Sequence, residues 1–428
     1  MKLFKFLTFS FFKSSGALLT FGYIFLSTKV LSPTEYGILA LLITLINLGG
    51  AVLSFGIPAY LFEIMSSKKH LKKFNEKIKI IFIIILPISF FFLLITNYYS
   101  NFISIWFFKN NEYNFVINLL GSLFFFAILN RIFSSYFIAT KKYYVSTIGD
   151  NFLFPFFILI FLLISFVLKD INFSTFIKFV LFLIPIISLY YLFFIKINFT
   201  FLNIKTSLKK YKEFLKPCFD LTIVSISGII LISSDIIILG ILSEPTSVSN
   251  YHIATKVSSV ITLILASSMS FYYGKSLKLF KENNFDALRK QVYKVNLHSL
   301  LISLTFLIFI LLTYNQIIKF FFYDVDMIIL KKLIFILCFG QFVNVIFGYQ
   351  GSLLIIISKY RRVVSNIFLF TVLFNILTSI YAFYLFGTLG IAIATMLSIV
   401  LRELLISYFF TKHYGFHPLS YIKSIFIS

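Results

Sequence analysis

Long apolar stretches, separated by short polar segments, run along the whole chain. A bilayer core about 30 Å thick needs around 20 apolar residues in a helix to cross it, and stretches of that length recur throughout. They predict about twelve transmembrane helices, at residues 11–31, 36–62, 78–98, 113–138, 144–168, 173–195, 218–243, 251–273, 295–318, 331–357, 364–386 and 389–410. The polar segments are too short to hold a domain outside the membrane. The pattern therefore predicts an all-α integral membrane protein.

The composition excludes a water-soluble fold. Of the 428 residues, 60% are hydrophobic and only 12% are charged, against roughly 45–50% apolar and 25% charged in soluble domains. A net charge of +23 would suggest nucleic acid as the partner of a soluble protein. A chain this apolar has no polar face that could bind nucleic acid. We therefore expect the basic residues to contact anionic membrane lipids.

The chain shows no signature of a cofactor or metal site. Cys218 and Cys338 both lie inside apolar stretches without metal-ligand spacing, so we predict neither a disulfide framework nor a metal site. No nucleotide-binding loop is present, which argues against ATP as the direct energy source.

Lysine and arginine concentrate in alternate polar segments, and loops rich in these residues are retained in the cytoplasm. The basic segments are the N-terminus, 63–79, 139–143, 196–216, 274–294, 358–363 and the C-terminal tail. This alternation predicts that both termini are cytoplasmic.

Similar short motifs recur in the two halves of the chain. LSPTEYG at 31–37 corresponds to LSEPT at 242–246, and KKYYVS at 141–146 corresponds to KYRRVVS at 359–365, at offsets of roughly 211 to 218 residues. Each half would contain about six spans. An even number makes the repeats parallel, with a central cavity between them. We therefore predict an N-terminal six-helix half at 1–212 and a C-terminal six-helix half at 213–428.

Further motifs occur in a characteristic order: FGIP at 55–58, EFLKP at 213–217, SDIIILG at 234–240, VSNYHIATK at 248–256 and YLFGTLGIA at 384–392. Together with the chain length and the number of spans, they resemble bacterial polysaccharide flippases, the Wzx-type O-antigen and capsule transporters. These belong to the multidrug/oligosaccharidyl-lipid/polysaccharide exporter (MOP) superfamily. The resemblance extends over nearly the whole chain.

This resemblance implies a transporter and not an enzyme. The implied activity is to move undecaprenyl-diphosphate-linked oligosaccharide repeat units from the cytoplasmic to the periplasmic leaflet of the bacterial inner membrane by alternating access. The product would serve the synthesis of O-antigen, capsule or another surface polysaccharide. A polysaccharide polymerase and chain-length machinery are implied as further partners.

Cations inside the predicted spans are candidates for binding the diphosphate, because a charge in a bilayer usually faces a cavity. They are Arg131, Lys256, Arg402 and Lys29. Arg131 lies too deep to reach the interface, and its guanidinium offers a fork of donors suited to phosphate oxygens. A structural partner such as Asp150 is the alternative role. Lys29 lies near a span end and can extend to the headgroups, so it ranks last.

Asp235, Glu403 and Asp150 are the candidate cavity acids or ion-coupling groups. Asp235 and Lys256 lie at comparable depth on consecutive spans. They could form an ion pair. Alternatively, Lys256 could bind phosphate while Asp235 holds the Lys256 side chain or takes up a cation. The adjacent residues Arg402 and Glu403 point about 100° apart, which predicts that they do not pair and that at least one has a partner on another helix.

Two other functions are compatible with a multi-span chain. A multidrug cation antiporter of the same superfamily would need carboxylates more than cations in its cavity. A membrane-bound polysaccharide polymerase or ligase would be expected to carry a long outer loop. The longest predicted outer segment, 99–112, is short, which argues against such an enzyme.

Overall fold

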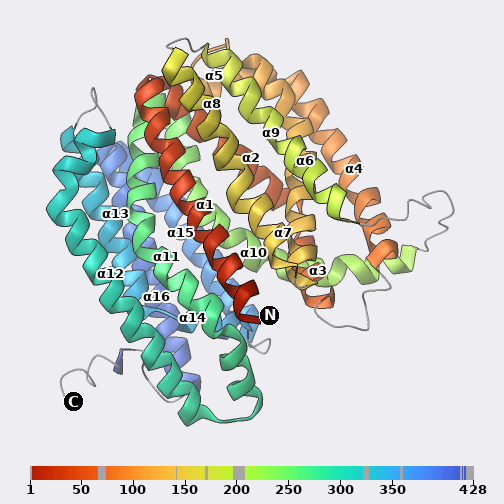
Figure 1. Cartoon of the computed structure of the whole chain (residues 1–428), viewed down its shortest axis with the longest axis vertical. Helices are drawn as coiled ribbons and strands as arrows, with labels where there is room; N and C mark the ends of the chain where they lie inside the picture. The colour runs from red at the N-terminus through yellow and green to blue at the C-terminus, as the bar shows by residue number, and fades with distance from the viewer. Residues whose placement is uncertain are drawn as a thin grey trace. The chain divides into compact units, whose positions relative to one another are not determined.

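The computed structural model describes residues 2–65, 74–140, 142–168, 172–195, 208–321, 327–356, 360–414, 417 and 419–420. Over these residues the chain forms helices joined by short turns and contains no strand (Figure 1). The predicted all-α fold is confirmed.

The helices of the first part of the chain follow one another closely. They are α1 (Lys2–Val30), α2 (Pro33–Leu53), α3 (Ile57–Met65), α4 (Phe74–Tyr98), α5 (Ser100–Phe108), α6 (Asn114–Ala139), α7 (Tyr143–Thr147), the π-helix η2 (Ile148–Leu153), α8 (Phe154–Leu168) and α9 (Phe173–Phe194). The remaining helices are α10 (Leu208–Leu242), α11 (Pro245–Lys281), α12 (Phe285–Phe321), α13 (Met327–Phe347), α14 (Gln350–Ile356), α15 (Arg361–Phe386) and α16 (Thr388–Tyr414).

Within the described residues, nine spans are long and apolar enough to cross a membrane, and a tenth is a pair bent by 49° within α10. The predicted spans 11–31 and 251–273 fall on α1 and α11, and parts of both helices have side chains outside the described set. The total of about twelve spans stays a prediction.

Two predicted spans are each broken into two helices. The span at 36–62 is split between α2 and α3, where Phe55 and Gly56 have φ of 45° and 64°. The span at 331–357 is split between α13 and α14 at Gly348, whose φ is 69°. A right-handed helix cannot continue through a left-handed residue. Hydropathy does not register such a break, because the residues on both sides are apolar.

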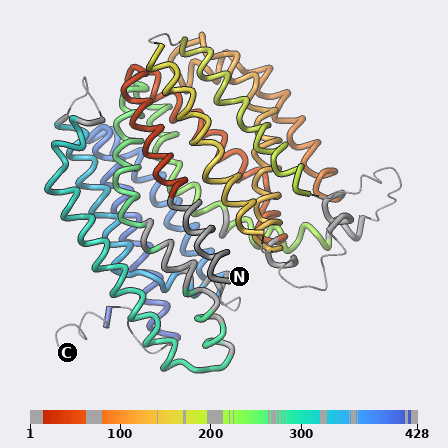
Figure 2. The backbone as a smooth tube through the Cα atoms, viewed as in Figure 1, coloured from red at the N-terminus to blue at the C-terminus, as the bar shows by residue number. Residues whose placement is uncertain are grey.

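The predicted basic loop at 274–294 is helical. α11 extends to Lys281 and α12 starts at Phe285, with only Asn283 in the left-handed region at φ 54°. Figure 2 shows the two helices joined by this short turn. Leu288, Val292 and Val295 are buried on the inner face of the hairpin. Apolar residues at helical spacing therefore give this charged segment a packing face.

The chain divides into two compact units. The first comprises Met1–Ile229 with Gly240–Ser249, and the second comprises Ile230–Leu239 with Asn250–Ser428. In the first unit α6 packs against α2, α3, α4, α5 and α9, and in the second α16 packs against α13, α14 and α15. One central helix therefore organises each unit. The prediction of two equivalent halves with a boundary at 212/213 stays a prediction.

The repeated LSPTEYG and LSEPT motifs have a structural role in the first unit. Ser32 caps α2: its hydroxyl accepts from the Glu35 N–H at 3.3 Å, and Glu35 Oε2 accepts from the Ser32 N–H at 2.8 Å. Pro33 begins the helix, and Gly37 packs directly against the backbone of Pro245 in the second motif. These residues fix helix starts and a close approach of the backbones, so they explain the motif without a ligand.

The close packing of α4 against α6 gives a first test. A Cβ at Gly121 of α6 would lie 2.7 Å from the backbone nitrogen of Leu93 in α4, whereas a Cβ built at Gly228 of α10 would meet no atom of another described segment within 4 Å. Gly121→Val should destabilise the protein by about 1–3 kcal/mol through overpacking. Thermal unfolding in detergent measures the effect, and Gly228→Val is the control for the same change of side chain. Equal midpoints for the two variants would contradict the packing described.

Candidate functional site

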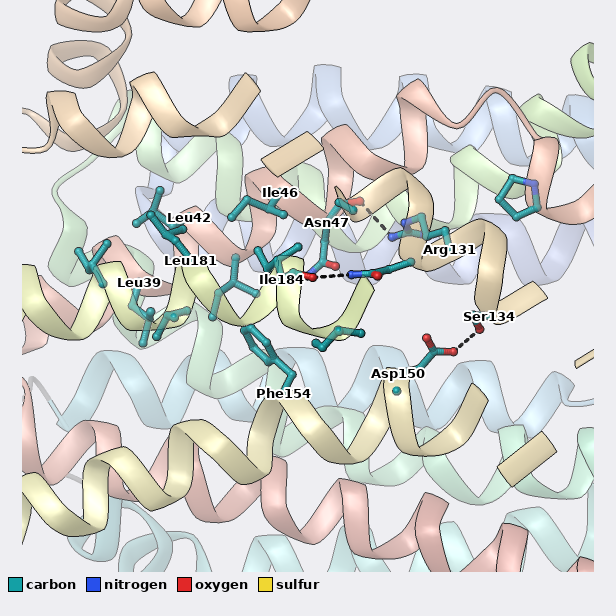
Figure 3. A pocket seen from close by; sticks show the side chains of 18 of the residues that line it. Leu39, Leu42, Ile46, Asn47, Arg131, Ser134, Asp150, Phe154, Leu181 and Ile184 are labelled. Atoms are coloured by element: carbon teal, nitrogen blue, oxygen red, sulfur yellow. Dashed lines mark hydrogen bonds between the residues drawn. The ribbon is translucent and has the colours of Figure 1, made fainter. Parts of the chain in front are cut away.

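A cavity of about 440 Å³ lies inside the first unit. Its walls come from α2, α3, α6, η2, α8 and α9, and most of the lining side chains are aliphatic (Figure 3). The polar lining residues are Asn47, Asn130, Arg131, Ser134, Ser135 and Asp150. An apolar cavity with a few convergent polar groups is typical of a small-molecule or headgroup site.

Arg131 lies in this cavity, about 12 Å along the helix from the end of α6. Its Nη2 donates to the Asn47 carbonyl oxygen of α2 at 3.0 Å (Figure 3). Asp150 lines the same cavity, but within the described residues no carboxylate forms an ion pair with the guanidinium. Arg131 therefore keeps donors available for an anionic ligand.

Asp150 is held by hydroxyl groups instead of by Arg131. Its Oδ2 accepts from Ser134, and from Ser146 at 3.2 Å, while Oδ1 accepts from Tyr191 Oη at 2.6 Å. The residue lies on the π-helix η2, whose wider turn changes the direction of the side chains, and π-helices of this kind are frequent at functional sites. The alternative role predicted for Arg131, as the ion-pair partner of Asp150, is not observed.

Several site residues were not identified from the sequence. Asn130 joins α6 to α9, because its Nδ2 donates to the Ile184 carbonyl at 3.1 Å and its Oδ1 accepts from Ser188 at 2.7 Å. Asn130 and Ser134 are four residues apart on an apolar helix, with Arg131 between them in sequence. This spacing places the two polar side chains on one helix face and could have marked them from the sequence. No sequence pattern distinguishes Tyr191, because Tyr and Phe are abundant throughout the chain.

A second polar cluster, inside the second unit, surrounds Asp235 of α10. Its Oδ2 accepts hydrogen bonds from Tyr251 of α11 and Thr395 of α16, each at 2.7 Å. Asn375 of α15 joins the cluster by donating to Thr395 at 3.3 Å and accepting from Ser234 at 2.9 Å. Asp235 is 2% exposed, and among the described residues its buried Oδ1 has no hydrogen-bond partner.

Lys256 forms no ion pair with Asp235 in the described part of the chain. The reason lies in helix geometry. Tyr251 faces Asp235, and five residues along α11 turn the side chain by about 140°. Of the two readings left open for Asp235 and Lys256, the ion pair is therefore not observed. Lys256 is half-buried on another face of α11.

The prediction that Arg402 and Glu403 do not pair is wrong. Arg402 Nη2 and Nε lie 2.8 Å and 2.9 Å from Glu403 Oε1, and the side chains are 13% and 5% exposed. The 100° step separates the two Cβ positions, but the long Arg402 side chain bends around the helix. Its guanidinium also lies 5.4 Å from the Phe368 ring centroid. Arg402 is thus neutralised inside α16, and it is a weaker candidate for a ligand than Arg131.

Lys29 lies in the last turn of α1, where its Nζ is 5.9 Å from the ring centroid of Phe25, one turn earlier. The structure therefore leaves Lys29 outside both polar clusters.

The fold and these clusters define a class of multi-pass membrane protein. In the described part of the chain, four structural features are typical of such a protein: an all-helical architecture, broken spans, a cation in a cavity, and a buried carboxylate hydrogen-bonded by hydroxyl groups. A family profile described as "Polysaccharide biosynthesis protein" matches residues 5–272, which is more than half of the chain. The chain belongs to this family, and the resemblance predicted from its motifs is confirmed.

Solved structures share the fold. The lipid II flippase MurJ, in an inward closed conformation, has a TM-score of 0.73 and 16% identity, covering 98% of this chain and 91% of that chain. An inward-facing multidrug resistance MATE family transporter of the MOP superfamily has a TM-score of 0.67 and 14% identity, covering 93% and 94%. MATE in complex with MaD3S has a TM-score of 0.60 and 13% identity, covering 96% and 94%. No curated protein matches the sequence.

The Arg402–Glu403 pair gives the second test. Glu403→Gln should leave a buried cation uncompensated and destabilise the protein by about 3–5 kcal/mol, while the double variant Arg402→Met/Glu403→Met should restore most of that loss. Thermal unfolding in detergent provides the comparison. Glu282→Gln is the matched control, because Glu282 pairs with Lys278 at 3.7 Å while 51% exposed, and surface pairs contribute little. A tolerated Glu403→Gln would show that the pair does not stabilise α16.

Proposed function

We propose that this protein is a flippase for undecaprenyl-diphosphate-linked oligosaccharide. It moves the repeat unit from the cytoplasmic to the periplasmic leaflet of the bacterial inner membrane by alternating access, with both termini cytoplasmic. Membership of the polysaccharide biosynthesis family and the fold shared with a lipid II flippase support this activity. The repeat unit would supply O-antigen, capsule or another surface polysaccharide. A polymerase and chain-length machinery would act on the product.

The observation that carries the proposal is the position of Arg131. Its guanidinium forms no ion pair with a described carboxylate and faces a cavity of about 440 Å³ that Asp150 also lines and whose other walls are mostly aliphatic. A volume of this size suits a charged headgroup and not a whole oligosaccharide. We therefore assign Arg131 to the diphosphate, with Lys256 as a second cation and with Arg402 and Lys29 in lesser roles.

Asp235 is the candidate for ion coupling in this proposal. A buried carboxylate without a cation partner is costly unless it is protonated or binds a cation. Its two hydrogen-bonding neighbours, Tyr251 and Thr395, are neutral, and Oδ1 has no hydrogen-bond partner among the described residues. Binding of a proton or a monovalent cation would satisfy that oxygen. Asp150 and Glu403 are weaker candidates, because hydroxyl groups already donate to Asp150 and Arg402 already pairs with Glu403.

The membrane potential can also contribute to transport. Moving two negative charges outward across an inside-negative potential of 100 mV is favourable by about 4.6 kcal/mol. This is large enough to drive a net export without nucleotide hydrolysis.

Arg131→Ala should reduce the initial rate of flipping by about tenfold or more, because each charge-assisted hydrogen bond to phosphate contributes about 1.5–3 kcal/mol. Arg131→Lys should retain part of the rate, since lysine keeps the charge but loses the donor fork. The measurement uses proteoliposomes and follows an undecaprenyl-diphosphate-linked oligosaccharide by its accessibility to an external enzyme.

Arg362→Ala is the matched control, because it removes an exposed guanidinium at the start of α15. Wild-type flipping by a well-folded Arg131→Ala variant would refute the role of Arg131. Export of cationic dyes without lipid flipping by the wild type would instead identify a multidrug antiporter, whose fold this chain shares.

Asp235→Asn should abolish the response of transport to an imposed proton or sodium gradient. Asparagine can still accept from Tyr251 and Thr395, but it cannot take up a proton or balance a cation. The same proteoliposomes report the rate with and without each gradient, and Asn375→Ser, a change to a neutral member of the cluster, controls for local repacking. An undiminished gradient response in Asp235→Asn would remove Asp235 from the coupling mechanism.

A further inference from the structure

A second cavity, of about 400 Å³, lies in the second unit where α12 ends and α13 begins. Three lysines line it: Lys319 near the end of α12, and Lys331 and Lys332 in the first turns of α13. Its remaining walls include Asn315 and the apolar side chains of Ile318, Ile328 and Phe335. None of the proposed transport residues contributes to it.

The position of this lysine cavity relative to the membrane follows from the helices that form it. One apolar span ends at Lys319 and the next begins at Ile328. The cavity therefore lies at the level where two spans leave the hydrocarbon core. Lipid phosphates occupy this level of a bilayer, while the acyl chains lie deeper, beside apolar side chains.

Lys331 is held in place within the cavity. Its Nζ donates to Tyr314 Oη at 2.9 Å and lies 4.3 Å and 5.9 Å from the ring centroids of Tyr314 and Phe335. Lys319 and Lys332 are exposed. A lysine already held beside two rings loses less conformational freedom on binding a ligand than an unrestrained lysine does, which favours binding of an anion.

The three cations have no carboxylate partner within the described residues. The sequence carries Asp324 and Asp326 in the segment 322–326, which lies outside that set. Even with both acids counted, the lysines exceed them by one. Three ammonium groups around one hollow repel each other, and an anion bound among them relieves this repulsion.

We propose that the lysine cavity binds the phosphate of an anionic phospholipid. Lys319, Lys331 and Lys332 contact the phosphate oxygens, and Asn315 offers an amide donor. The apolar side chains of Ile318, Ile328 and Phe335 contact the start of the acyl chains. The ligand belongs to the surrounding leaflet, so this site does not depend on the transported substrate.

The test compares two triple variants of the full-length protein that lose equal charge. Lys319→Gln/Lys331→Gln/Lys332→Gln removes the cavity cations. Lys275→Gln/Lys290→Gln/Lys294→Gln removes three exposed lysines of the α11–α12 hairpin. Each protein is placed in phosphatidylcholine nanodiscs and titrated with phosphatidylglycerol, and native mass spectrometry counts the phosphatidylglycerol molecules that remain bound.

The cavity variant should lose the most tightly held phosphatidylglycerol, with affinity lower by roughly fivefold per lysine removed, while the hairpin variant retains it. Thermal unfolding confirms that both variants are folded. Equal retention or equal loss in the two variants would overturn the proposal. Geranylgeranyl diphosphate is added as a competitor. If it displaces phosphatidylglycerol at a lower concentration than inorganic diphosphate or added phosphatidylglycerol does, the cavity binds a lipid diphosphate. That result would also overturn the phospholipid site.

Discussion

Polar groups inside a bilayer find no water, and each must be satisfied by the protein itself. The structure meets this constraint at two central helices. In α6, the cavity side chains of Asn130 and Arg131 bond to backbone carbonyls of α9 and α2. In α16, Thr395 donates to Asp235 and Glu403 neutralises Arg402. The packing of each unit around one helix therefore also places its polar groups, because the neighbouring helices supply the missing partners.

The same constraint separates structural charges from candidate functional ones. Both carboxylate oxygens of Asp150 accept from hydroxyl groups, and Glu403 Oε1 pairs with the Arg402 guanidinium. Arg131 lines a cavity without an ion-pair partner, and Asp235 has one buried oxygen that no described residue hydrogen-bonds. All four residues lie inside membrane spans, so depth in the membrane does not distinguish them. They differ in how far hydrogen bonds and ion pairs within the protein already satisfy their charged groups. For this reason our proposal places an anion at Arg131 and a proton or cation at Asp235.

Two of the motifs that carry the family resemblance, LSPTEYG and FGIP, stabilise the fold. LSPTEYG begins α2 with a capping box, and its Gly37 allows contact with the backbone of Pro245. FGIP includes the left-handed residues that separate α2 from α3. Such positions restrict which residues can occupy them, because a cap needs a hydroxyl and a positive φ favours glycine. The structural roles of these two motifs therefore do not identify a ligand.

Hydropathy and motif order were sufficient to establish an all-helical membrane protein of this family, because a span needs only length and apolar composition. The same pattern could not show the breaks at Gly56 and Gly348, which depend on backbone conformation. Nor could it show that Arg402 folds back onto Glu403, that Tyr251 and not Lys256 faces Asp235, or that hydroxyls from three elements surround Asp150. The partners on different helices lie far apart in sequence: Tyr191 is 41 residues from Asp150, and Thr395 is 160 residues from Asp235. Only the packing of the helices brings them within hydrogen-bonding distance.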